Sequence, residues 1–347
     1  MIQDDLRELI SNGIEALRTD GVVSTETPDI QLERPARSEH GHFSTNIALV
    51  MARDAGTSPR QLAETLVPMI PQSKLVDKTE IAGPGFINFY LSNEWLHATV
   101  REIATAKQAY GRTDTGANER ISVEFVSANP TGPLHAGAGR NAALGHALAN
   151  LLEAVGHQVW REYYINDTGN QLDRFARSIE ARYRQALGHD VAVPEDGYQG
   201  NYLIEMGRKL AEAEAMGMIG KLDEITEWAL EESVASHQAS LSRFGVHFDE
   251  WFKETSLHES GAVQAAIDQL IESGHTFESE GAVWFRSRDG GGTRDQVVVR
   301  SNGTPTYLAA DIAYLLNKCE RGFDKALYLW GADHHGNVES LLAAARL

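Results

Sequence analysis

The residues best suited to chemistry lie in one short segment, 124–140, with the sequence EFVSANPTGPLHAGAGR. An apolar run, a Pro- and Gly-rich turn and a helical pattern follow one another, which predicts a strand that leads into a helix N-terminus. Such a terminus offers free backbone N–H groups and the positive end of the helix dipole, which suit phosphate. Gly137 and Gly139 would let a ligand approach the backbone, His135 would add a donor, and Arg140 a fixed charge. Many βα turns contain Gly and Pro, so a purely structural turn is an equally good interpretation of these residues alone.

Two histidine pairs, His334-His335 and His40-Gly41-His42, raise the question of a metal site. Adjacent histidines on a strand point to opposite faces, whereas His40 and His42 would share a face in extended chain. Neither pair has a Cys or a further His nearby at the spacing that completes a ligand set. We therefore expect no metal site built from these side chains.

The elements that must position the segment 124–140 form a βαβ pattern. Alternating apolar residues predict strands at 120–126 and 158–165, with a helix at 140–155 between them and Gly156 as its stop signal. A crossover of this kind joins parallel strands, so the pattern predicts an α/β core. The helix would bury one face, formed by Ala143, Ala147, Leu151 and Val155.

The N-terminal part of the chain, residues 1–112, has the pattern of a small α/β domain. Apolar residues at helical spacing predict an amphipathic helix at 3–18, and Thr-Ser-Pro starts a second helix at 57–66. A Gly/Pro turn and an alternating run predict a strand within 81–91. The polar, turn-rich stretch 113–119 is the predicted linker.

Beyond the linker, the α/β pattern is interrupted. Residues 120–169 would form the first half of the core, and 300–347 its second part, with a helix near 309–321 and a strand at 325–330. The stretch 170–299 between them contains long acidic helical runs and two β-like runs on either side of three glycines, which resemble a hairpin. We interpret 170–299 as an insertion.

Composition is that of an ordinary soluble protein, with 42% hydrophobic and 23% charged residues. No apolar run reaches the roughly 20 residues that span a bilayer, and the acidic N-terminus is no secretory signal. Cys319 is the only cysteine, which fits a reducing compartment, so we expect a cytoplasmic protein without membrane contact. The net charge of −18 disfavours nucleic acid, but residues 195–282 hold 18 acidic and 5 basic residues and therefore most of it. Basic patches elsewhere stay possible.

The motifs resemble those of arginyl-tRNA synthetases. His135-Ala-Gly-Ala138 stands where class I synthetases have His-x-Gly-His, and its context EFVSANPTGPL with RNAA resembles the arginine enzymes specifically. Further similar blocks follow in family order, and two more resemble that family's N-terminal domain. They are REYYINDTGNQ (161–171), RSNGTPTYLAADIAY (300–314), GADHHG (331–336), SEHGHFSTNIAL (38–49) and GFINF (85–89).

This resemblance implies a Rossmann-like parallel-sheet catalytic core behind a small tRNA-contacting α/β domain. It also implies an ATP-dependent arginine–tRNA ligase, with a monomer as the expected state. Arginine and ATP, with Mg²⁺, would give arginyl-adenylate, and the arginyl group would pass to the terminal ribose of tRNA-Arg. Such chemistry depends on positioning and charge stabilisation around an in-line displacement.

The resemblance also assigns expected roles to residues. Recognising a guanidinium requires carboxylates, and Tyr307 and Asp311 would share a helix face at the arginine site. A surface acid at a helix start is the alternative interpretation of Asp311. The expected arginine-binding residues are Glu124, Ser127, Asn129, Tyr307, Asp311 and Asp333. The expected ATP-binding residues are Pro130, Thr131, His135, Gly137, Gly139, His334 and His335, with His135, Gly137, Ala138 and Arg140 at the catalytic motif. Expected tRNA contacts are Phe86, Asn88 and Phe89, for which strand packing is an equal alternative.

Two departures from the family pattern limit the expected activity. Ala138 replaces the second histidine, and losing one such donor can cost about 2.7–4 kcal/mol of transition-state stabilisation. The chain also stops at Leu347, before the family's Lys-Met-Ser-Lys-like loop and anticodon-binding domain, so we expect a fragment with weak or no ligase activity alone. A non-catalytic arginine- or nucleotide-binding paralogue and a class I nucleotidyl transferase for another substrate are the alternatives.

Overall fold

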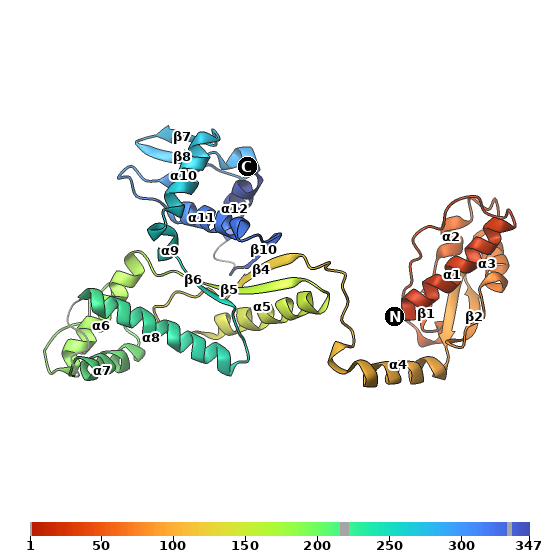
Figure 1. Cartoon of the computed structure of the whole chain (residues 1–347), viewed down its shortest axis with the longest axis horizontal. Coiled ribbons are helices and arrows are strands. Elements are labelled where there is room, and N and C mark those ends of the chain that lie inside the picture. The colour runs from red at the N-terminus through yellow and green to blue at the C-terminus, as the bar shows by residue number, and fades with distance from the viewer. Residues whose placement is uncertain (1, 216–221, 332–334) are drawn as a thin grey trace. The chain divides into compact units, whose positions relative to one another are not determined.

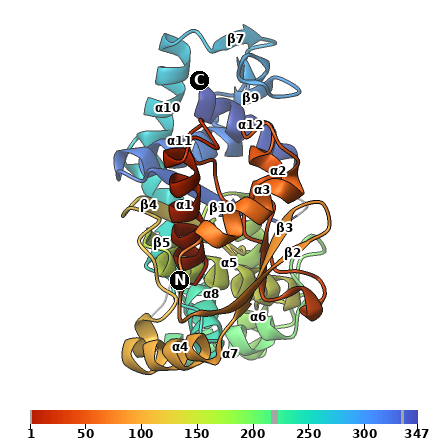
Figure 2. The same cartoon turned by 90° about the vertical axis from the view of Figure 1, so that its right-hand side faces the viewer.

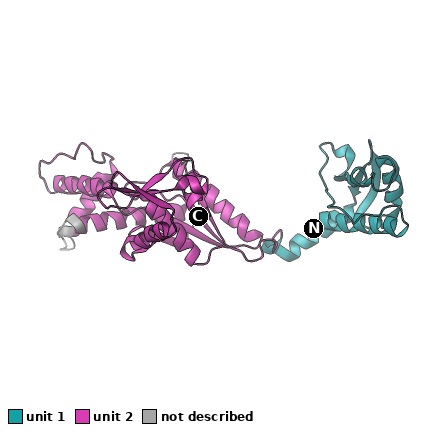
Figure 3. Ribbon diagram, turned by 90° about the horizontal axis from the view of Figure 1, so that it is seen from above, with its two compact units in different colours: residues 1–110 teal, residues 111–347 magenta. Residues whose placement is uncertain are grey.

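The computed structural model describes residues 2–215, 222–331 and 335–347. The chain divides into two compact units, Met1–Tyr110 and Gly111–Leu347 (Figure 3). None of the helices described is long and apolar enough to cross a membrane.

The first unit packs helices on a three-stranded antiparallel sheet. Its sheet has the order β1-β3-β2, and β3 lies in the middle. Helix α1 buries Leu6, Ile10, Ile14 and Leu17, as the helical spacing predicts, and a Ser58–Gln61 capping box starts α3. The elements are α1 (Ile2–Thr19), η1 (Ser38–His40), β1 (Phe43–Thr45), α2 (Ile47–Met51), α3 (Pro59–Leu66), η2 (Val67–Met69), β2 (Val76–Ala82), β3 (Phe86–Leu91), α4 (Asn93–Ala106) and η3 (Lys107–Ala109).

A four-stranded parallel sheet organises the second unit. Strands β4 (Arg120–Phe125), β5 (Gln158–Ile165), β6 (Glu250–Lys253) and β10 (Lys325–Leu329) pair in the order β10-β4-β5-β6. All three pairings are parallel. Helix α5 (Ala136–Ala154) connects β4 to β5 across one face. The Rossmann-like α/β class predicted from the sequence is therefore confirmed.

Two helical groups cover the two faces of this sheet (Figures 1 and 2). Helices α5 and α8 pack on one face, and α10 and α11 share a core with side chains of the other. Helices α6 and α7 form a further small core together with one end of α8. The helices are α6 (Asn170–Ala186), α7 (Tyr202–Ala215), α8 (Leu222–Arg243), α9 (Thr255–Glu259), α10 (Ala262–Glu272), α11 (Tyr307–Glu320) and α12 (His335–Arg346).

The predicted insertion 170–299 needs two corrections. It contains β6, which pairs with β5 in the core sheet, so this interval is not wholly an insertion. The two β-like runs are also not one hairpin, because they form three antiparallel strands, β7 (Thr276–Ser279), β8 (Ala282–Phe285) and β9 (Gln296–Val299), with η4 (Ser287–Gly290) before β9. A four-residue strand within an acidic region gives too short a periodic signal to be recognised.

The predicted buried face of α5 is wrong. Small residues pack against the sheet, namely Ala138, Ala142, Gly145 and Ala149, whereas Leu151 is 66% exposed. A Cβ atom on Gly145 would lie 2.3 Å from the Phe125 ring, so the helix approaches β4 more closely than any larger residue allows. Hydrophobicity favoured the leucine face, but the distance between helix and sheet decides which face is buried.

We expect Gly145→Ala to destabilise the second unit by about 1–3 kcal/mol, because overpacking forces the Phe125 ring or the helix to move. The free energy of unfolding from urea titration measures this effect. Gly139→Ala in the same helix is the control, since a Cβ there meets nothing within 4 Å. That change should stabilise by roughly 0.5–1 kcal/mol. Equal behaviour of the two variants would contradict the close approach.

Candidate active site

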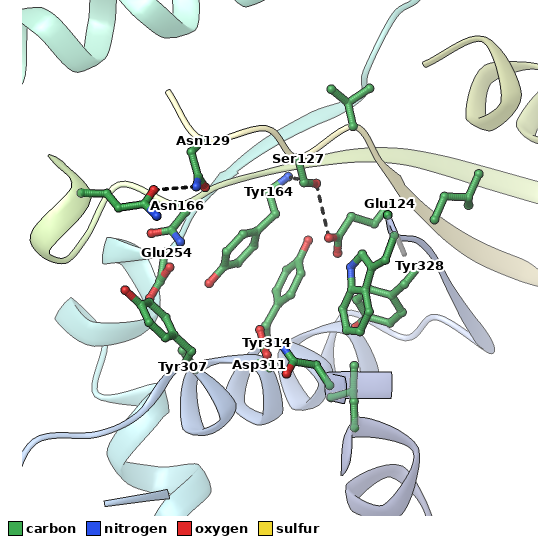
Figure 4. A pocket seen from close by; sticks show the side chains of 18 residues that line it. Glu124, Ser127, Asn129, Tyr164, Asn166, Glu254, Tyr307, Asp311, Tyr314 and Tyr328 are labelled. Carbon is green, nitrogen blue, oxygen red and sulfur yellow. Dashed lines mark hydrogen bonds between the residues drawn. The ribbon is translucent and has the colours of Figure 1, made fainter. Parts of the chain in front are cut away.

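An acidic pocket opens where the carboxyl ends of the core strands meet α11 (Figure 4). This edge of a parallel sheet is where ligands of α/β proteins bind. The pocket has a volume of about 320 Å³. Residues of β4, β5 and β10, of the loops after β4 and β6, and of α11 line it. They include Glu124, Ser127, Asn129, Tyr164, Asn166, Gln171, Glu254, Tyr307, Asp311, Tyr314 and Tyr328.

Among the described residues, three carboxylates line this pocket: Glu124, Glu254 and Asp311. Burial, and then the charges of Glu124 and Glu254, raise the pKa of Asp311 to about 7. Thr168 Oγ1 donates to Glu254 Oε1 at 2.9 Å. Within the described residues, no lysine or arginine forms an ion pair with Asp311 or Glu254. Burial is the main cause of the raised pKa of Asp311, the two neighbouring carboxylates add to it, and the charge of Lys318 offsets it only in part.

Glu124, in contrast, already has a cationic partner. Lys318 is 1% exposed, and its Nζ lies 2.9 Å from Glu124 Oε2 and 3.8 Å from Glu162 Oε1. The rings of Tyr314 and Tyr328 lie 4.1 and 3.9 Å from the same Nζ. The second oxygen of Glu124 accepts from Ser127 Oγ at 3.3 Å.

Glu162 completes the buried network behind the pocket. Arg321 Nη2 lies 2.5 Å from Glu162 Oε2, and the Tyr314 hydroxyl donates to Glu162 Oε1. Two lysine or arginine charges therefore balance Glu124 and Glu162. Asp311 and Glu254 are left to attract a cationic ligand.

Sequence reasoning placed Glu124, Ser127, Asn129, Tyr307 and Asp311 together, and the structure brings all five to this pocket. It missed Glu254 and Lys318. Glu254 follows β6, a strand that was not predicted because its residues were interpreted as part of an insertion. Lys318 could have been found, because Tyr307, Asp311, Tyr314 and Lys318 recur at the spacing of one helix face. Asp333 lies outside the described residues.

A second pocket adjoins the first along the turn after β4. The two share Val126, Ser127, Asn129, Trp330 and Gly331, so ligands bound in them would lie next to each other. The second is larger, about 940 Å³, and extends to the start of α5. Its other lining residues include Thr131, Gly132, His135, Gly137, Ala138, Arg140, Tyr198 and Tyr202.

His135 is the N-cap of α5. Its Nδ1 accepts from the Gly137 N–H at 3.0 Å, so Nε2 carries the proton and is the ring's donor. A Cβ on Gly137 would lie 2.8 Å from the His135 ring, whereas one on Gly139 meets nothing within 4 Å. Gly137 therefore makes room for the histidine, and Gly139 is the position where the helix surface is open. Gly137 lines the second pocket and Gly139 lines neither of the two, so ligand approach at these glycines stays a prediction.

The turn that joins the two pockets is strained. Val126 and Ser127 have φ values of +70° and +39°, which L-residues rarely adopt. Each such residue costs about 1–3 kcal/mol and persists only where its surroundings fix it. Asn141 of α5 accepts from the Val126 N–H at 2.8 Å and donates to the Leu329 carbonyl at 2.8 Å, which ties the turn to α5 and β10. Strain of this kind is typical of functional sites.

Several predicted contacts are not supported. Pro130 is buried within the turn and lines neither pocket. His334 and the side chain of His335 lie outside what the structure describes. In the first unit, Phe89 and Asn88 are 1% and 4% exposed, which favours the alternative that these side chains pack within their own domain. Phe86 is 39% exposed and remains a candidate.

Comparisons with known proteins agree with these motifs. The family model of the arginyl tRNA synthetase N-terminal domain matches residues 4–91. The model of the class I (R) tRNA synthetase catalytic domain matches residues 99–347. An arginine–tRNA ligase of Heliobacterium modesticaldum is 48% identical over 92% of this chain, and one of Bacillus subtilis is 42% identical over 99%.

A solved structure is similar as well. The arginyl-tRNA synthetase of Thermus thermophilus matches 91% of the chain with a TM-score of 0.59 and 25% identity. The chain spans 58% and 63% of the two ligases and 53% of the solved chain. The family that the motifs predicted is thus confirmed, and the chain belongs to the class I arginyl-tRNA synthetases.

Proposed function

We propose that the two adjoining pockets hold arginine and ATP for an arginine–tRNA ligase reaction. The observation that carries this proposal is the acidic pocket, in which Asp311 and Glu254 have no lysine or arginine partner among the described residues. A guanidinium pairs with carboxylates in fork geometry, and aromatic rings favour its flat face. Tyr307, whose ring faces the pocket, and Tyr164 add hydroxyl groups beside the two carboxylates (Figure 4).

The polar side chains at the other end of the acidic pocket suit the amino-acid backbone of arginine. Asn129 lies on the border of the two pockets, and its Nδ2 donates to Gln171 at 2.7 Å. An arginine with its guanidinium at Asp311 would direct its carboxylate toward this border. The carboxylate would then face the α-phosphate of a nucleotide in the second pocket, as adenylate formation requires.

In the second pocket, α5 supplies its N-terminus. The helix dipole and the backbone N–H groups there favour phosphate, His135 Nε2–H offers a further hydrogen-bond donor, and the exposed Arg140 provides positive charge. Within the described ranges, no three His, Cys, Asp or Glu side chains gather as metal ligands. Mg²⁺ belongs to the proposal only as the ion that accompanies ATP. Transfer to tRNA-Arg, with Phe86 as a contact, completes the proposed reaction.

A non-catalytic arginine- or nucleotide-binding protein is the second candidate. Ala138 supports it, because this buried residue lines the second pocket and offers no donor where the family pattern has histidine. Arginine-dependent exchange of pyrophosphate into ATP separates the candidates. The ligase proposal expects exchange that stops when Asp311 becomes Asn, whereas a pure binding protein would bind arginine and ATP without exchange.

Arginine affinity should rise with pH as Asp311 ionises. The carboxyl has a pKa of about 7 in the empty pocket, and a guanidinium pairs with its ionised form. Below the pKa, binding must therefore release a proton. We expect the affinity to increase about tenfold from pH 6 to pH 8 and then to level off, since arginine itself stays charged.

Calorimetry across this pH range measures the effect, and two buffers of different ionisation enthalpy should reveal release of about half a proton at pH 7. His258 is the control, because its Nε2 lies 3.6 Å from Glu254, beside the same pocket. The His258→Asn variant should keep the pH dependence. A constant affinity from pH 6 to pH 8 would show that Asp311 does not pair with the ligand.

A further inference from the structure

Side chains from three elements hold backbone carbonyls of the turn 128–133. The turn forms one wall of the nucleotide pocket, yet two of the three side chains come from helices of the acidic region, on α7 and α8. The proposed reaction assigns no part to these two helices. Neither arginine binding in the acidic pocket nor phosphate binding at the start of α5 accounts for the contacts of these helices with the turn.

His237 of α8 contacts the turn at Gly132. It is buried, and its Nε2 lies 2.7 Å from the Gly132 carbonyl, which only accepts, so Nε2 donates. Its Nδ1 lies 3.0 Å from the hydroxyl of Tyr163, and that hydroxyl lies 2.9 Å from the Ala128 carbonyl. Because Nδ1 then has no proton, the single Tyr163 hydroxyl proton is donated either to the Ala128 carbonyl or to Nδ1. Side chains of β5 and α8 that contact each other thus lie against both ends of the turn.

Tyr202 of α7 holds the turn between these ends. Its hydroxyl donates to the Thr131 carbonyl at 2.6 Å. A Cβ on Gly132 would lie 3.0 Å from the same hydroxyl oxygen, so the phenol is packed directly against the backbone. Tyr202 also lines the nucleotide pocket itself, and it packs against the α6–α8 core. Tyr202 therefore links the core of helices α6–α8 directly to the wall of the nucleotide pocket.

The turn needs such support because the residues that lead into it have an unfavourable backbone conformation. Val126 and Ser127 enter it in the left-handed region, where a β-branched residue is strained. A strained entry relaxes unless the following backbone is fixed. Hydrogen bonds to the carbonyls of 128, 131 and 132 come from β5, α7 and α8, while Asn141 of α5 accepts from the N–H of Val126 at the start of the turn.

We propose that Tyr202 and His237 are positioning residues for the nucleotide, which keep the turn 128–133 in the conformation that binds ATP. This inference rests on the proposed function, because it assigns ATP to the second pocket. The acidic helices then brace the nucleotide site without touching the reacting atoms. Arginine should depend on them much less, since the carboxylates that pair with its guanidinium, Asp311 and Glu254, lie on α11 and after β6, and only Asn129 at its other end belongs to the turn.

The test compares variants of the whole chain by calorimetry with a non-hydrolysable ATP analogue and, separately, with arginine. Loss of one hydrogen bond should weaken the analogue about fivefold in Tyr202→Phe, and somewhat more, about tenfold, in His237→Leu. His237→Gln retains an N–H donor for Gly132 and should recover most of the affinity. Arginine affinity should change less than twofold. Tyr183→Phe is the matched control, because Tyr183 packs in the same helical core without lining the pocket.

Hydrogen exchange of the free protein provides a readout that needs no ligand. Amides of 126–133 should exchange faster in Tyr202→Phe and His237→Leu than in the parent or the control. Unchanged exchange in both variants would overturn the inference, and so would faster exchange with unchanged analogue affinity. Equal weakening of arginine and analogue would indicate a general structural role and also overturn it. A parent chain that binds neither ligand contradicts the proposed function instead, and the exchange result then still decides whether these side chains hold the turn.

Discussion

Arginine affinity is expected to fall about 100-fold, or about 2.7 kcal/mol, when Asp311 is replaced by Asn. The variant keeps the shape of the side chain but removes a charge that the guanidinium would neutralise. Truncating one partner of a desolvated charge pair commonly costs 2–5 kcal/mol or more, and the estimate lies at the lower end because Glu254 stays in place. Calorimetry with arginine at pH 8, above the pKa of Asp311, measures the loss.

The same variant should be at least as stable as the parent. Burial and two neighbouring carboxylates raise the pKa of Asp311, which means that its charge is unfavourable in the empty pocket. Removing the charge relieves that cost, so the Tm should stay the same or rise, as is common where function requires an unfavourable arrangement. Asp173→Asn, at an exposed site on α6, is the control and should leave arginine affinity unchanged. An Asp311→Asn variant with affinity within threefold of the parent would refute this role.

Lys318→Met should destabilise the second unit by about 3–5 kcal/mol. The change keeps most of the side-chain volume but leaves Glu124 without its partner at 2.9 Å and removes the charge from between the rings of Tyr314 and Tyr328. Breaking a buried ion pair from one side leaves an uncompensated charge, and that is the origin of the large cost. The free energy of unfolding from urea titration measures it.

A second substitution checks this explanation. Glu124→Gln in the Lys318→Met background removes the unpaired charge, so it should restore a large part of the lost stability. Glu162 keeps Arg321 as a partner in both variants, at 2.5 Å. A double variant no more stable than Lys318→Met alone would mean that packing around the lysine stem, and not its charge, dominates.

Sequence reasoning predicted the parts of the site whose signals are local. The βαβ unit of β4, α5 and β5, the helix α11 and the strand β10 follow from periodicity, and the motif residues lie at their ends. Tyr307 and Asp311 share a helix face for the same reason, and both line the acidic pocket. Features set by one element and its immediate neighbours in sequence were thus accessible before the structure.

The remaining parts depend on contacts between distant segments. Glu254 enters the pocket only because β6 extends the sheet, and the Lys318–Glu124 pair joins residues 194 positions apart. The buried face of α5 depends on how closely Gly145 approaches Phe125, which hydrophobicity does not encode. The hold of Tyr202 and His237 on the turn likewise requires the fold of the acidic helices. Non-local packing decided each of these features.

Binding of arginine compared with citrulline to the whole chain at pH 8 tests the central claim most directly. Citrulline has nearly the same shape but a neutral ureido group, so it lacks the charge that Asp311 and Glu254 would pair with. The acidic pocket predicts that arginine binds and that citrulline binds at least about 100-fold more weakly. Equal affinity for the two, or no binding of arginine, would contradict the assignment of this pocket to the guanidinium.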